Sequence, residues 1–361
     1  MWVSHISAQG FRNLSLSGVP LSQGVNILYG DNAQGKTNIL ETVYFCAIGR
    51  SLRADNNREL VRFGSDEAHV QVQVMSDDYS FTIDGHIRIS GNKSTKTLSI
   101  DKQIVRNTRE LFGRLMVVLF SPEDLKLIKA GPAERRRFMD MEICQLSPVY
   151  YSELRDYYRA LKQRNQLLKT LRKDRAQADT LYIWDEQLYI SGCRIMRTRE
   201  MFVQKINTIA CEIHSRITGG KEELALMYQP NICNPDDYRE LLHKSHERDV
   251  ISGTTSKGVH KDDILFTIND IPARNYGSQG QQRTAALSAK LAEIEIMRAK
   301  ATPVLLLDDV LSELDGGRQR FLLTQIGDLQ TILTCTGLED VLAKGVNDAN
   351  VINVRGGEAR F

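Results

Sequence analysis

A glycine-rich segment at residues 30–37, which reads Gly-Asp-Asn-Ala-Gln-Gly-Lys-Thr, limits the possible folds of this chain more than any other stretch. It fits the G-x-x-x-x-G-K-[ST] pattern of a P-loop at every defined position. An apolar run at 25–29 precedes it, and apolar residues with helical spacing follow it at 38–48. A buried strand that leads through a glycine loop into a helix is the setting in which this pattern binds phosphate. The segment therefore predicts a nucleotide-binding α/β fold.

Phosphate chemistry gives a role to most residues of this loop. The glycines allow consecutive backbone N–H groups to turn inward around a β-phosphate, and the N-terminus of the following helix favours negative charge. Lys36 is expected to reach the β- and γ-phosphates, and the Thr37 hydroxyl to hold Mg²⁺. We therefore predict ATP and Mg²⁺ as ligands, with ATP contacts from Gly30, Asp31, Asn32, Ala33, Gln34, Gly35, Lys36 and Thr37.

A second motif at 304–309, Val-Leu-Leu-Leu-Asp-Asp, has the pattern of an apolar strand that ends in two carboxylates. A strand in the same sheet as the P-loop can place Asp308 next to Mg²⁺. Asp309 would then lie on the γ-phosphate side, where a carboxylate can orient or deprotonate the attacking water. ABC ATPases usually have glutamate at this second position, so the shorter Asp309 predicts slow hydrolysis.

Residues 276–283, Tyr-Gly-Ser-Gln-Gly-Gln-Gln-Arg, precede a helical pattern and have the form of an ABC signature loop. A serine, a flexible glycine and a helix N-terminus can together receive an anion, and the alternative is that Ser278 acts only as a helix cap. In an ABC-type fold this loop meets the γ-phosphate held by a second copy of the chain, so ATP would join a homodimer. The expected contacts are Ser278, Gly280 and Gln281, with Ser278 acting beside Lys36 and Asp309 in hydrolysis.

Two further regions have distinct patterns. Apolar and polar residues alternate in short stretches between 70 and 100, which predicts a small antiparallel sheet with an Asp-Gly turn at 84–85. Residues 122–251 have helical spacing, and they predict an antiparallel helical hairpin joined near 174–180.

Strand and helix patterns alternate after residue 252, starting with a strand at 263–268. This alternation predicts a mainly parallel sheet. The expected architecture is therefore an α/β, ABC-type ATPase head at 1–121 and 252–361, with a parallel sheet and an antiparallel β subdomain. The helical arm at 122–251 would be an insertion into this head.

Composition excludes several classes of protein. The six cysteines include no C-x-x-C pair, so a zinc ribbon or zinc hook is not expected. The longest clearly apolar runs are about five residues, against about 20 for a membrane helix, and the first residues lack a signal pattern. We expect a cytoplasmic protein with reduced cysteines. Since the net charge is only +2, any nucleic-acid surface must be a local basic patch.

The first predicted arm helix carries such a patch. A basic stripe can follow DNA phosphates without reading sequence, whereas a solvated helix face is the ordinary alternative. The arginine run at 135–137 could contact DNA or pair with nearby acids. The predicted DNA contacts are Arg135, Arg136, Arg155, Arg159, Lys162, Lys169, Arg172 and Lys173. Other members of the stripe are Arg164 and Arg175 on the first helix, and Arg194, Arg197, Arg199 and Lys205 on the second.

Several segments are more specific than the P-loop. They are Phe-Arg-Asn-Leu at 11–14, Ser-Pro-Glu-Asp-Leu at 121–125, Gly-Pro-Ala-Glu-Arg-Arg-Arg-Phe-Met-Asp at 131–140, and Asp-Asp-Val-Leu-Ser-Glu-Leu-Asp at 308–315. With the P-loop and the signature loop, they resemble the RecF family of bacterial recombination mediators over nearly the whole chain. At 258–263 the sequence reads Gly-Val-His-Lys-Asp-Asp, so Val259 and Lys261 replace the proline and arginine usual in that family.

This resemblance implies an ABC-type head similar to those of SMC proteins, without their long coiled coils. It implies ATP-dependent dimerisation, and slow ATP hydrolysis that DNA stimulates. It also implies binding at gaps where single-stranded DNA meets duplex, work with RecO and RecR, and help in loading RecA. Arg12 and Asn13 of the Phe-Arg-Asn segment would lie beside the nucleotide as further ATP contacts.

Three other classes share part of this pattern. A transporter ATPase would carry a switch histidine after the strand expected at 331–334, where only Thr336 could substitute. A P-loop nuclease of the overcoming-lysogenisation type needs an added acidic Toprim domain, for which no residues remain. A long-armed SMC-type head needs a longer helical arm. An ATP-gated DNA-binding clamp is the interpretation that we favour.

Overall fold

The structure of the protein, a computed structural model, describes residues 1–361 except for 55, 177, 340–347 and 361. It has two compact units, one of residues 1–124 and 293–361 and the other of residues 125–292. The second junction therefore lies at 292–293 and not at the predicted 251–252, because the strand at 263–268 pairs within the second unit.

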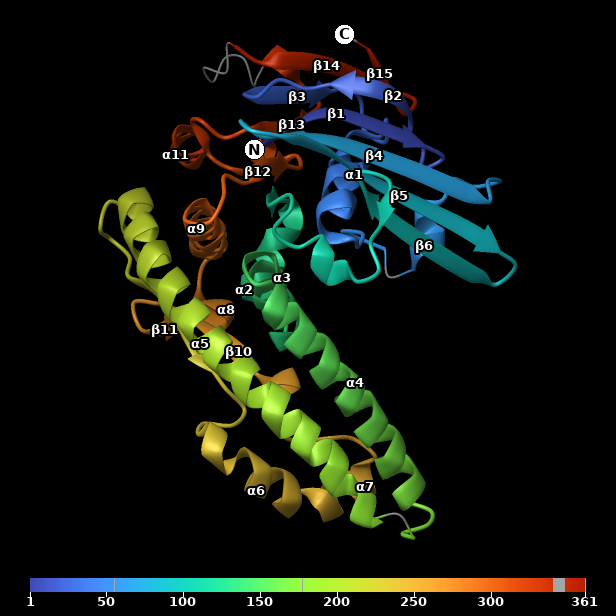
Figure 1. Cartoon of the computed structure of the whole chain (residues 1–361). Helices are drawn as coiled ribbons and strands as arrows, with labels where there is room; N and C mark the ends of the chain where they lie inside the picture. Colours follow the sequence, from blue (N-terminus) through green and yellow to red (C-terminus); the bar gives the residue numbers. More distant parts are fainter. Residues whose placement is uncertain (55, 177, 340–347, 361) are drawn as a thin grey trace. The chain divides into compact units, whose positions relative to one another are not determined.

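A six-stranded sheet in the first unit carries the P-loop, with the strand order β15-β14-β3-β13-β12-β8 (Figure 1). The five strands from β14 to β8 run parallel, and β15 pairs antiparallel with β14. Near-continuous apolar runs are typical of parallel strands that are covered on both faces. The strands are β3 (Val25–Tyr29), β8 (Val117–Phe120), β12 (Val304–Leu307), β13 (Thr331–Cys335), β14 (Asn350–Arg355) and β15 (Glu358–Arg360), and the helices are α1 (Lys36–Ile48), α10 (Val310–Glu313) and α11 (Gly316–Ile326).

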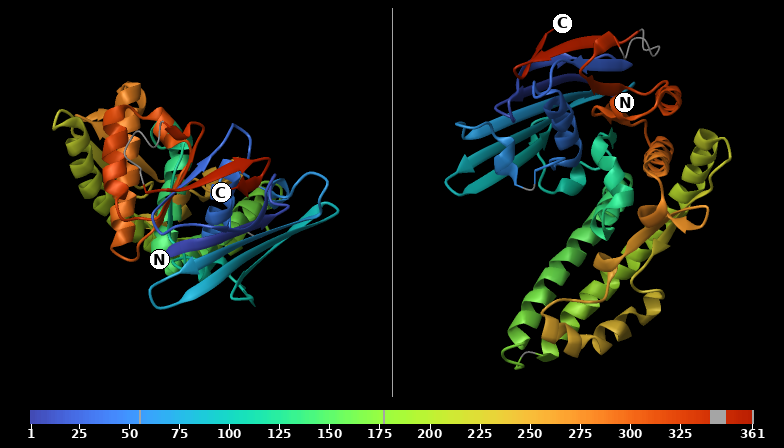
Figure 2. Two further views of the ribbon diagram at one scale, coloured as in Figure 1. Left: turned by 90° about the horizontal axis from the view of Figure 1, so that it is seen from above. Right: turned by 180° about the vertical axis from the view of Figure 1, so that it is seen from behind.

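An antiparallel sheet in the same unit has the order β2-β1-β4-β5-β6-β7, and α1 lies against one of its faces (Figure 2). The predicted turn at 84–85 is wrong, because both residues lie in the middle of one long strand, β5. A Cβ at Gly85 would lie 2.7 Å from Cε1 of Phe45 on α1, so the glycine permits close packing of helix and sheet. The strands are β1 (Trp2–Gln9), β2 (Ser15–Pro20), β4 (Glu67–Met75), β5 (Ser80–Ser90), β6 (Lys93–Ile100) and β7 (Gln103–Ile104).

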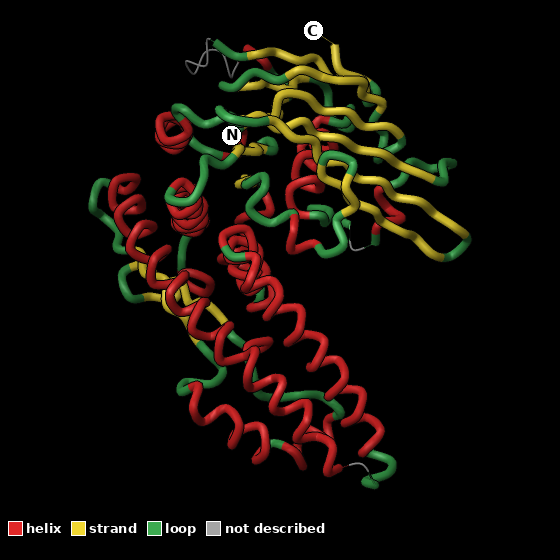
Figure 3. Tube along the Cα trace, viewed as in Figure 1, coloured by secondary structure: helices red, strands yellow, loops and turns green. Residues whose placement is uncertain are grey.

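The second unit is built around a helical hairpin of α4 and α5, which lie side by side (Figure 3). Their buried residues recur every three or four positions, as in Tyr157, Leu161 and Leu168 of α4, so the predicted hairpin is confirmed. The helices of this unit are α2 (Lys126–Lys129), α3 (Pro132–Leu146), α4 (Pro148–Leu171), α5 (Leu181–Thr218), α6 (Tyr238–Lys244), α7 (His246–Ser252) and α8 (Ala273–Tyr276); α9 (Gln279–Arg298) continues into the first unit.

A three-stranded antiparallel sheet, β11-β10-β9, also belongs to the second unit. Its strands are β9 (Leu224–Gln229), β10 (Asp263–Ile268) and β11 (Ile271–Pro272). The prediction of helix throughout 122–251 missed β9, and the strand predicted at 263–268 does not join the parallel sheet. Short 3-10 turns complete the chain at Asn57–Leu60, Thr108–Glu110, Pro122–Leu125, Ala178–Thr180, Pro235–Asp237 and Val259–Lys261. Among the described residues, no helix is long and apolar enough to cross a membrane.

Candidate functional site

The P-loop joins β3 to α1 through backbone conformations that favour glycine. Gly30 has φ +152°, Ala33 has φ +63°, and Gly35, which precedes the first residue of α1, has φ +113°. The side chain of Lys36 is buried, and its Nζ donates to the carbonyl oxygens of Gly30 at 2.7 Å and Asp31 at 3.0 Å. The lysine charge is thus held over the loop whose N–H groups were predicted to bind phosphate.

The end of β12 brings the predicted acidic pair to the start of α1. The Thr37 hydroxyl donates to Oδ1 of Asp308 at 2.7 Å, although 271 positions separate the two residues. β3, which leads into the P-loop, and β12 run parallel in one sheet, so their carboxyl ends lie at the same edge. The two predicted Mg²⁺ ligands therefore lie together.

Asp309 has a strained backbone at this edge. Its φ is +51°, in the left-handed region where aspartate and asparagine are the most tolerated non-glycine residues. Such a conformation costs on the order of 1–3 kcal/mol and is often found at functional sites. Burial raises the pKa of the Asp309 carboxyl, Lys36 opposes the shift, and the charge of Asp308 adds to it.

No sequence motif indicated Thr334, a buried residue near the end of β13. Its hydroxyl accepts from the backbone N–H of Asp309 at 2.9 Å and donates to Oδ1 of Asp308 at 3.1 Å. One side chain therefore holds both the Asp308 carboxylate and the Asp309 backbone. The available signal was a polar residue at the carboxyl end of an otherwise apolar strand, two positions before the Thr336 considered as a switch residue.

The Phe-Arg-Asn segment lies beside the P-loop helix. Arg12 donates to both carboxylate oxygens of the buried Glu41, from Nε at 3.0 Å and Nη2 at 3.2 Å. Burial alone would raise the pKa of Glu41, but hydrogen bonds from Arg12 and Ser51 outweigh it and lower that pKa. Glu41 also pairs with Arg53 at 3.1 Å, so two arginines share its carboxylate. The contact of Arg12 with a phosphate stays a prediction.

Asn13 contacts the P-loop directly. Its Nδ2 donates to the Gln34 carbonyl oxygen at 3.2 Å, and its Oδ1 accepts from Asn38 Nδ2 at 2.8 Å. Asn13 thus supports the loop from outside, which is a role that the sequence did not indicate.

The signature loop lies in the second unit at the start of α9. Ser278 Oγ accepts from the Gln281 N–H at 3.2 Å, and Gln281 Oε1 accepts from the Ser278 N–H at 2.8 Å. This reciprocal pair is a capping box, so Ser278 caps α9. Contact of Ser278, Gly280 and Gln281 with a partner's nucleotide stays a prediction.

Arg135 is not available for the predicted contact with DNA. Its buried guanidinium donates to both carboxylate oxygens of Asp263, at 2.6 Å and 2.9 Å. Arg136 is partly buried and donates from Nη1 to the Asp262 carbonyl oxygen at 2.7 Å. Arg135 therefore pairs with an acid, since α3 packs against β10. Arg136 bonds to a backbone carbonyl, and its contact with DNA stays a prediction.

Two other members of the basic stripe are also buried. Arg164 forms ion pairs with Asp185 at 2.6 Å and Asp249 at 2.8 Å. Arg199 is likewise fully buried, and it pairs with Asp140 and Asp262. Both were assigned to the stripe wrongly, because helical position decides which charges face the core. The exposed members on and just beyond α4 are Arg155, Arg159, Lys162, Lys169, Arg172, Lys173 and Arg175. Of these, Arg155 pairs with Asp156 and Arg175 pairs with Glu247.

His260 is a partly buried residue of the second unit. Its Nδ1 is 2.8 Å from the Tyr157 hydroxyl, and its Nε2 is 3.0 Å from the Thr255 carbonyl oxygen. A neutral ring that carries its proton on Nε2 satisfies both partners. Burial lowers the pKa of His260 to about 4.

This lowered pKa predicts a loss of stability in acid. Between pH 6.5 and 4, His260 binds a proton in the unfolded chain but stays neutral in the folded protein. The free energy of unfolding therefore falls as the pH falls through this window. The loss amounts to at most about 3 kcal/mol and levels off below the folded pKa. Urea unfolding at several pH values should show this loss in the wild type and lack it in His260→Gln. Equal pH dependence in both proteins would contradict the prediction.

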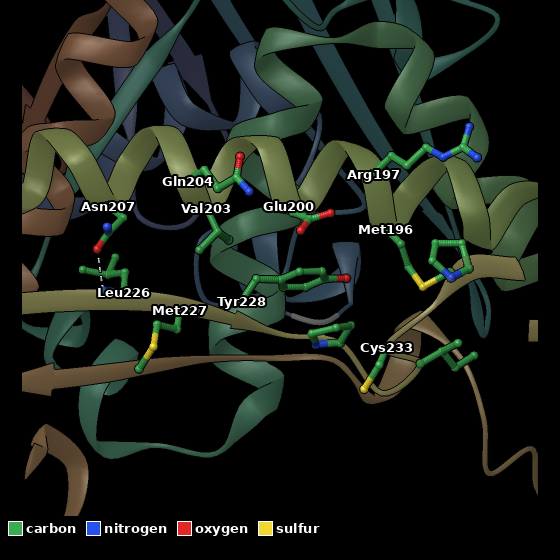
Figure 4. Close-up of a pocket in the computed structure, with 13 residues that line it drawn as sticks. Met196, Arg197, Glu200, Val203, Gln204, Asn207, Leu226, Met227, Tyr228 and Cys233 are labelled. Atoms are coloured by element: carbon green, nitrogen blue, oxygen red, sulfur yellow. Dashed lines mark hydrogen bonds between the residues drawn. The ribbon is translucent and has the colours of Figure 1, made fainter. Parts of the chain in front are cut away.

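A groove of about 300 Å³ also lies in the second unit, between α5, β9 and the segment at 230–235 (Figure 4). Polar and apolar side chains line it, among them Glu200, Tyr228 and Met227. The backbone N–H of Leu226 donates to Asn207 Oδ1 at 2.6 Å at its edge. None of the predicted ATP, Mg²⁺ or DNA contacts lines this groove.

The chain is similar to known proteins along its whole length. Residues 2–355 match the family model described as RecF/RecN/SMC N terminal domain. The DNA replication and repair protein RecF of Lachnospira eligens is 47% identical over 361 residues, covering 99% of this chain and 98% of that protein. The protein of the same name from Agathobacter rectalis is 45% identical over 362 residues, with 99% and 98% covered.

Solved structures agree with these relatives. The recombination mediator protein RecF with ATP, from the RecFOR pathway, superimposes with a TM-score of 0.90 at 32% identity, covering 99% of this chain and 97% of that one. The SMC head domain with an extended coiled coil from Pyrococcus furiosus gives a TM-score of 0.55 at 17% identity, with 99% and 95% covered, which is a likeness of fold alone.

Proposed function

Because this chain belongs to the RecF family of DNA replication and repair proteins, we propose that it is an ATP-gated DNA-binding protein. ATP joins two copies into a dimer that holds DNA, and slow hydrolysis of the ATP releases it. The observation that carries the proposal is the edge of the parallel sheet where the P-loop, the Thr37–Asp308 pair and Asp309 meet.

The same edge supports Mg²⁺ as the cofactor. A threonine hydroxyl and a carboxylate are hard oxygen ligands of the kind that Mg²⁺ prefers. Among the described residues no group of three or more His, Cys, Asp or Glu side chains could hold a metal. Mg²⁺ is usually bound by one or two protein groups together with nucleotide phosphates and water. Thr37 and Asp308 would hold the ion, which neutralises charge on the phosphates.

Different residues of the chain have different roles in ATP hydrolysis. Lys36 binds the β- and γ-phosphates, and Thr334 holds the Asp308 carboxylate and the Asp309 backbone. Asp309 positions the attacking water and accepts its proton. Ser278, Gly280 and Gln281 from a second copy bind the γ-phosphate through the N-terminus of α9. Loss of that phosphate would remove the bond between the two copies, so the nucleotide acts as a switch.

The exposed face of α4 is the proposed DNA surface. Arg155, Arg159, Lys162 and Lys169 recur at positions that share one side of the helix, opposite the buried Tyr157 and Leu161. Such a face can bind the backbones of single-stranded and duplex DNA without reading sequence. By family membership, we propose RecO and RecR as partners, and RecA as the protein whose loading they assist.

The decisive test is the DNA affinity of Asp309→Asn, measured by fluorescence anisotropy with ATP and then with ADP. This variant should keep ATP without hydrolysing it. We expect at least about tenfold tighter binding with ATP, because only ATP can join the two copies through its γ-phosphate. Equal affinity with both nucleotides would show that the nucleotide site does not control DNA.

Reversing the charge of the α4 face is expected to weaken DNA binding about 100-fold at low salt. In the triple variant Arg159→Glu, Lys162→Glu and Lys169→Glu, three phosphate contacts are lost, so the logarithmic salt slope should fall by about three. ATP affinity should not change. The matched control reverses three exposed charges of the antiparallel sheet, in Arg88→Glu, Lys93→Glu and Lys102→Glu. A loss of affinity only in this control would place DNA on the sheet instead.

A further inference from the structure

The turn between β14 and β15 lies against the middle of the P-loop. It consists of Gly356 and Gly357, with φ values of +60° and +83°, which is the two-residue turn geometry that favours glycine. The Gly357 N–H donates to the Gln34 carbonyl oxygen at 2.9 Å, and the Gly356 N–H donates to Gln34 Oε1 at 2.7 Å. Residues more than 300 positions away in sequence therefore hold the fifth residue of the P-loop.

Asn13 holds the same residue from a second direction. Its Nδ2 donates to the Gln34 carbonyl oxygen at 3.2 Å, so this oxygen accepts from both Asn13 and Gly357. A carbonyl oxygen has two lone pairs, and two donors occupy both of them. The direction of the Gln34 carbonyl is thus fixed by these two donors.

The direction of this carbonyl determines the direction of the next N–H group. In a planar trans peptide the C=O and the following N–H point in opposite directions. Holding the Gln34 oxygen against Asn13 and Gly357 therefore aims the Gly35 N–H to the opposite side. Gly35 is the glycine just before the P-loop lysine, and the N–H groups of this part of a P-loop bind the phosphates.

The contact leaves no room for a side chain at Gly357. A Cβ there would lie 2.0 Å from the Asn13 carbonyl oxygen and 2.8 Å from its carbon, which are both backbone atoms. The Gly357 carbonyl also accepts from the Ser15 N–H at 2.9 Å. The turn, the segment around Asn13 and Gln34 pack tightly together. A displacement of the turn must therefore also displace the contacts that hold the P-loop at Gln34.

We propose that the Gly356–Gly357 turn is a positioning element for nucleotide binding, which acts on the phosphates through Gln34 and the Gly35 N–H. The inference rests on the ATP-binding function proposed above. The rival explanation is that the turn only stabilises the edge of the sheet. A purely structural role would change the stability of the protein without changing its affinity for nucleotide.

The first test measures the dissociation constants of Mg²⁺ complexes of ATP and ADP for Gly357→Ala by isothermal titration calorimetry, together with the melting temperature. We expect both constants to rise about tenfold or more, because the loop N–H groups bind the β-phosphate that both nucleotides share. The matched control is Gly91→Ala. Gly91 has a similar φ of +56° in the turn between β5 and β6, and a Cβ there would have no other atom within 4 Å. Gly91→Ala should bind nucleotide as the wild type does.

A second variant keeps the backbone of the turn and removes one of its acceptors. Gln34→Met is similar in size but cannot accept from the Gly356 N–H. The ATP contact predicted for Gln34 is made by its backbone N–H, which methionine keeps, so the substitution isolates the contact with the turn. The KM for ATP should rise about threefold, a larger factor than any fall in kcat, because Lys36, Thr37 and Asp309 are untouched. This variant decides the question if Gly357→Ala does not fold.

Two results would overturn the inference. One is a lower melting temperature in Gly357→Ala with affinities equal to those of Gly91→Ala. The other is an unchanged KM in Gln34→Met. Failure of the wild type and Gly91→Ala to bind any nucleotide would be a different result, since it would overturn the proposed ATP-binding function itself.

Discussion

Replacing Lys36 with alanine is expected to raise the dissociation constant for ATP at least about 100-fold. The ammonium group is buried over the loop, where the Gly30 and Asp31 carbonyls already orient it. Hydrogen bonds between charged groups contribute about 1.5–3 kcal/mol each, and every 1.4 kcal/mol changes an affinity about tenfold. Loss of two such bonds to phosphate therefore gives an effect of this size. Titration of a fluorescent ATP analogue measures it directly.

The fold should survive this change, because alanine is favourable at the start of a helix and α1 keeps its packing. The matched control is Lys93→Ala, which removes an exposed lysine of the antiparallel sheet in the same unit. It should bind ATP with the wild-type constant. A dissociation constant for Lys36→Ala within threefold of wild type would mean that the loop does not bind the nucleotide.

Replacing Asp309 with asparagine is expected to lower ATP turnover about 100-fold or more, while ATP still binds. A positioned general base contributes about 10²–10⁴ to a rate, and the amide cannot accept the proton of the attacking water. Asparagine also tolerates the left-handed backbone of this position, where φ is +51°, so the loss should be chemical and not structural. Single-turnover hydrolysis and equilibrium ATP binding separate the two effects.

Asp309→Glu tests the same role by lengthening the side chain while keeping the carboxylate. Glutamate is the residue usual in ABC ATPases, and its longer side chain should raise turnover if the short carboxylate is what makes hydrolysis slow. Asp66→Asn, which changes an exposed carboxylate in the same unit, serves as the control and should not affect turnover. Unchanged turnover in Asp309→Asn would assign the base to another group.

Much of the fold could be predicted because its signals are local. The P-loop strand at 25–29 and the acid strand at 304–307 lie where their apolar runs and flanking motifs indicated. The failures occurred where tertiary contacts override a local signal. The Asp-Gly pair at 84–85 looked like a turn, yet Gly85 lies inside β5 because Phe45 needs the space of its missing side chain.

The candidate site also contains residues that a local motif identified and residues that only tertiary contacts revealed. A contiguous motif identified Lys36 and Thr37, because phosphate binding needs consecutive N–H groups with a fixed spacing of lysine and hydroxyl. No local pattern indicated Thr334, whose hydroxyl bonds to Asp308 across 26 positions. The arginines of the basic stripe look alike in sequence, but Arg135, Arg164 and Arg199 are buried in ion pairs whereas Arg159 is exposed.

The amino-acid sequence alone was sufficient for the fold class, for the ATP-binding motif and for the two acids expected to serve hydrolysis. These depend on short segments whose chemistry requires particular residues at particular spacings. Only the tertiary structure decided which charges remain free for DNA and which segments support the P-loop. The contact of Gly356 with Gln34 spans 322 positions, and such a contact follows from the path of the whole chain, which no single segment of sequence records.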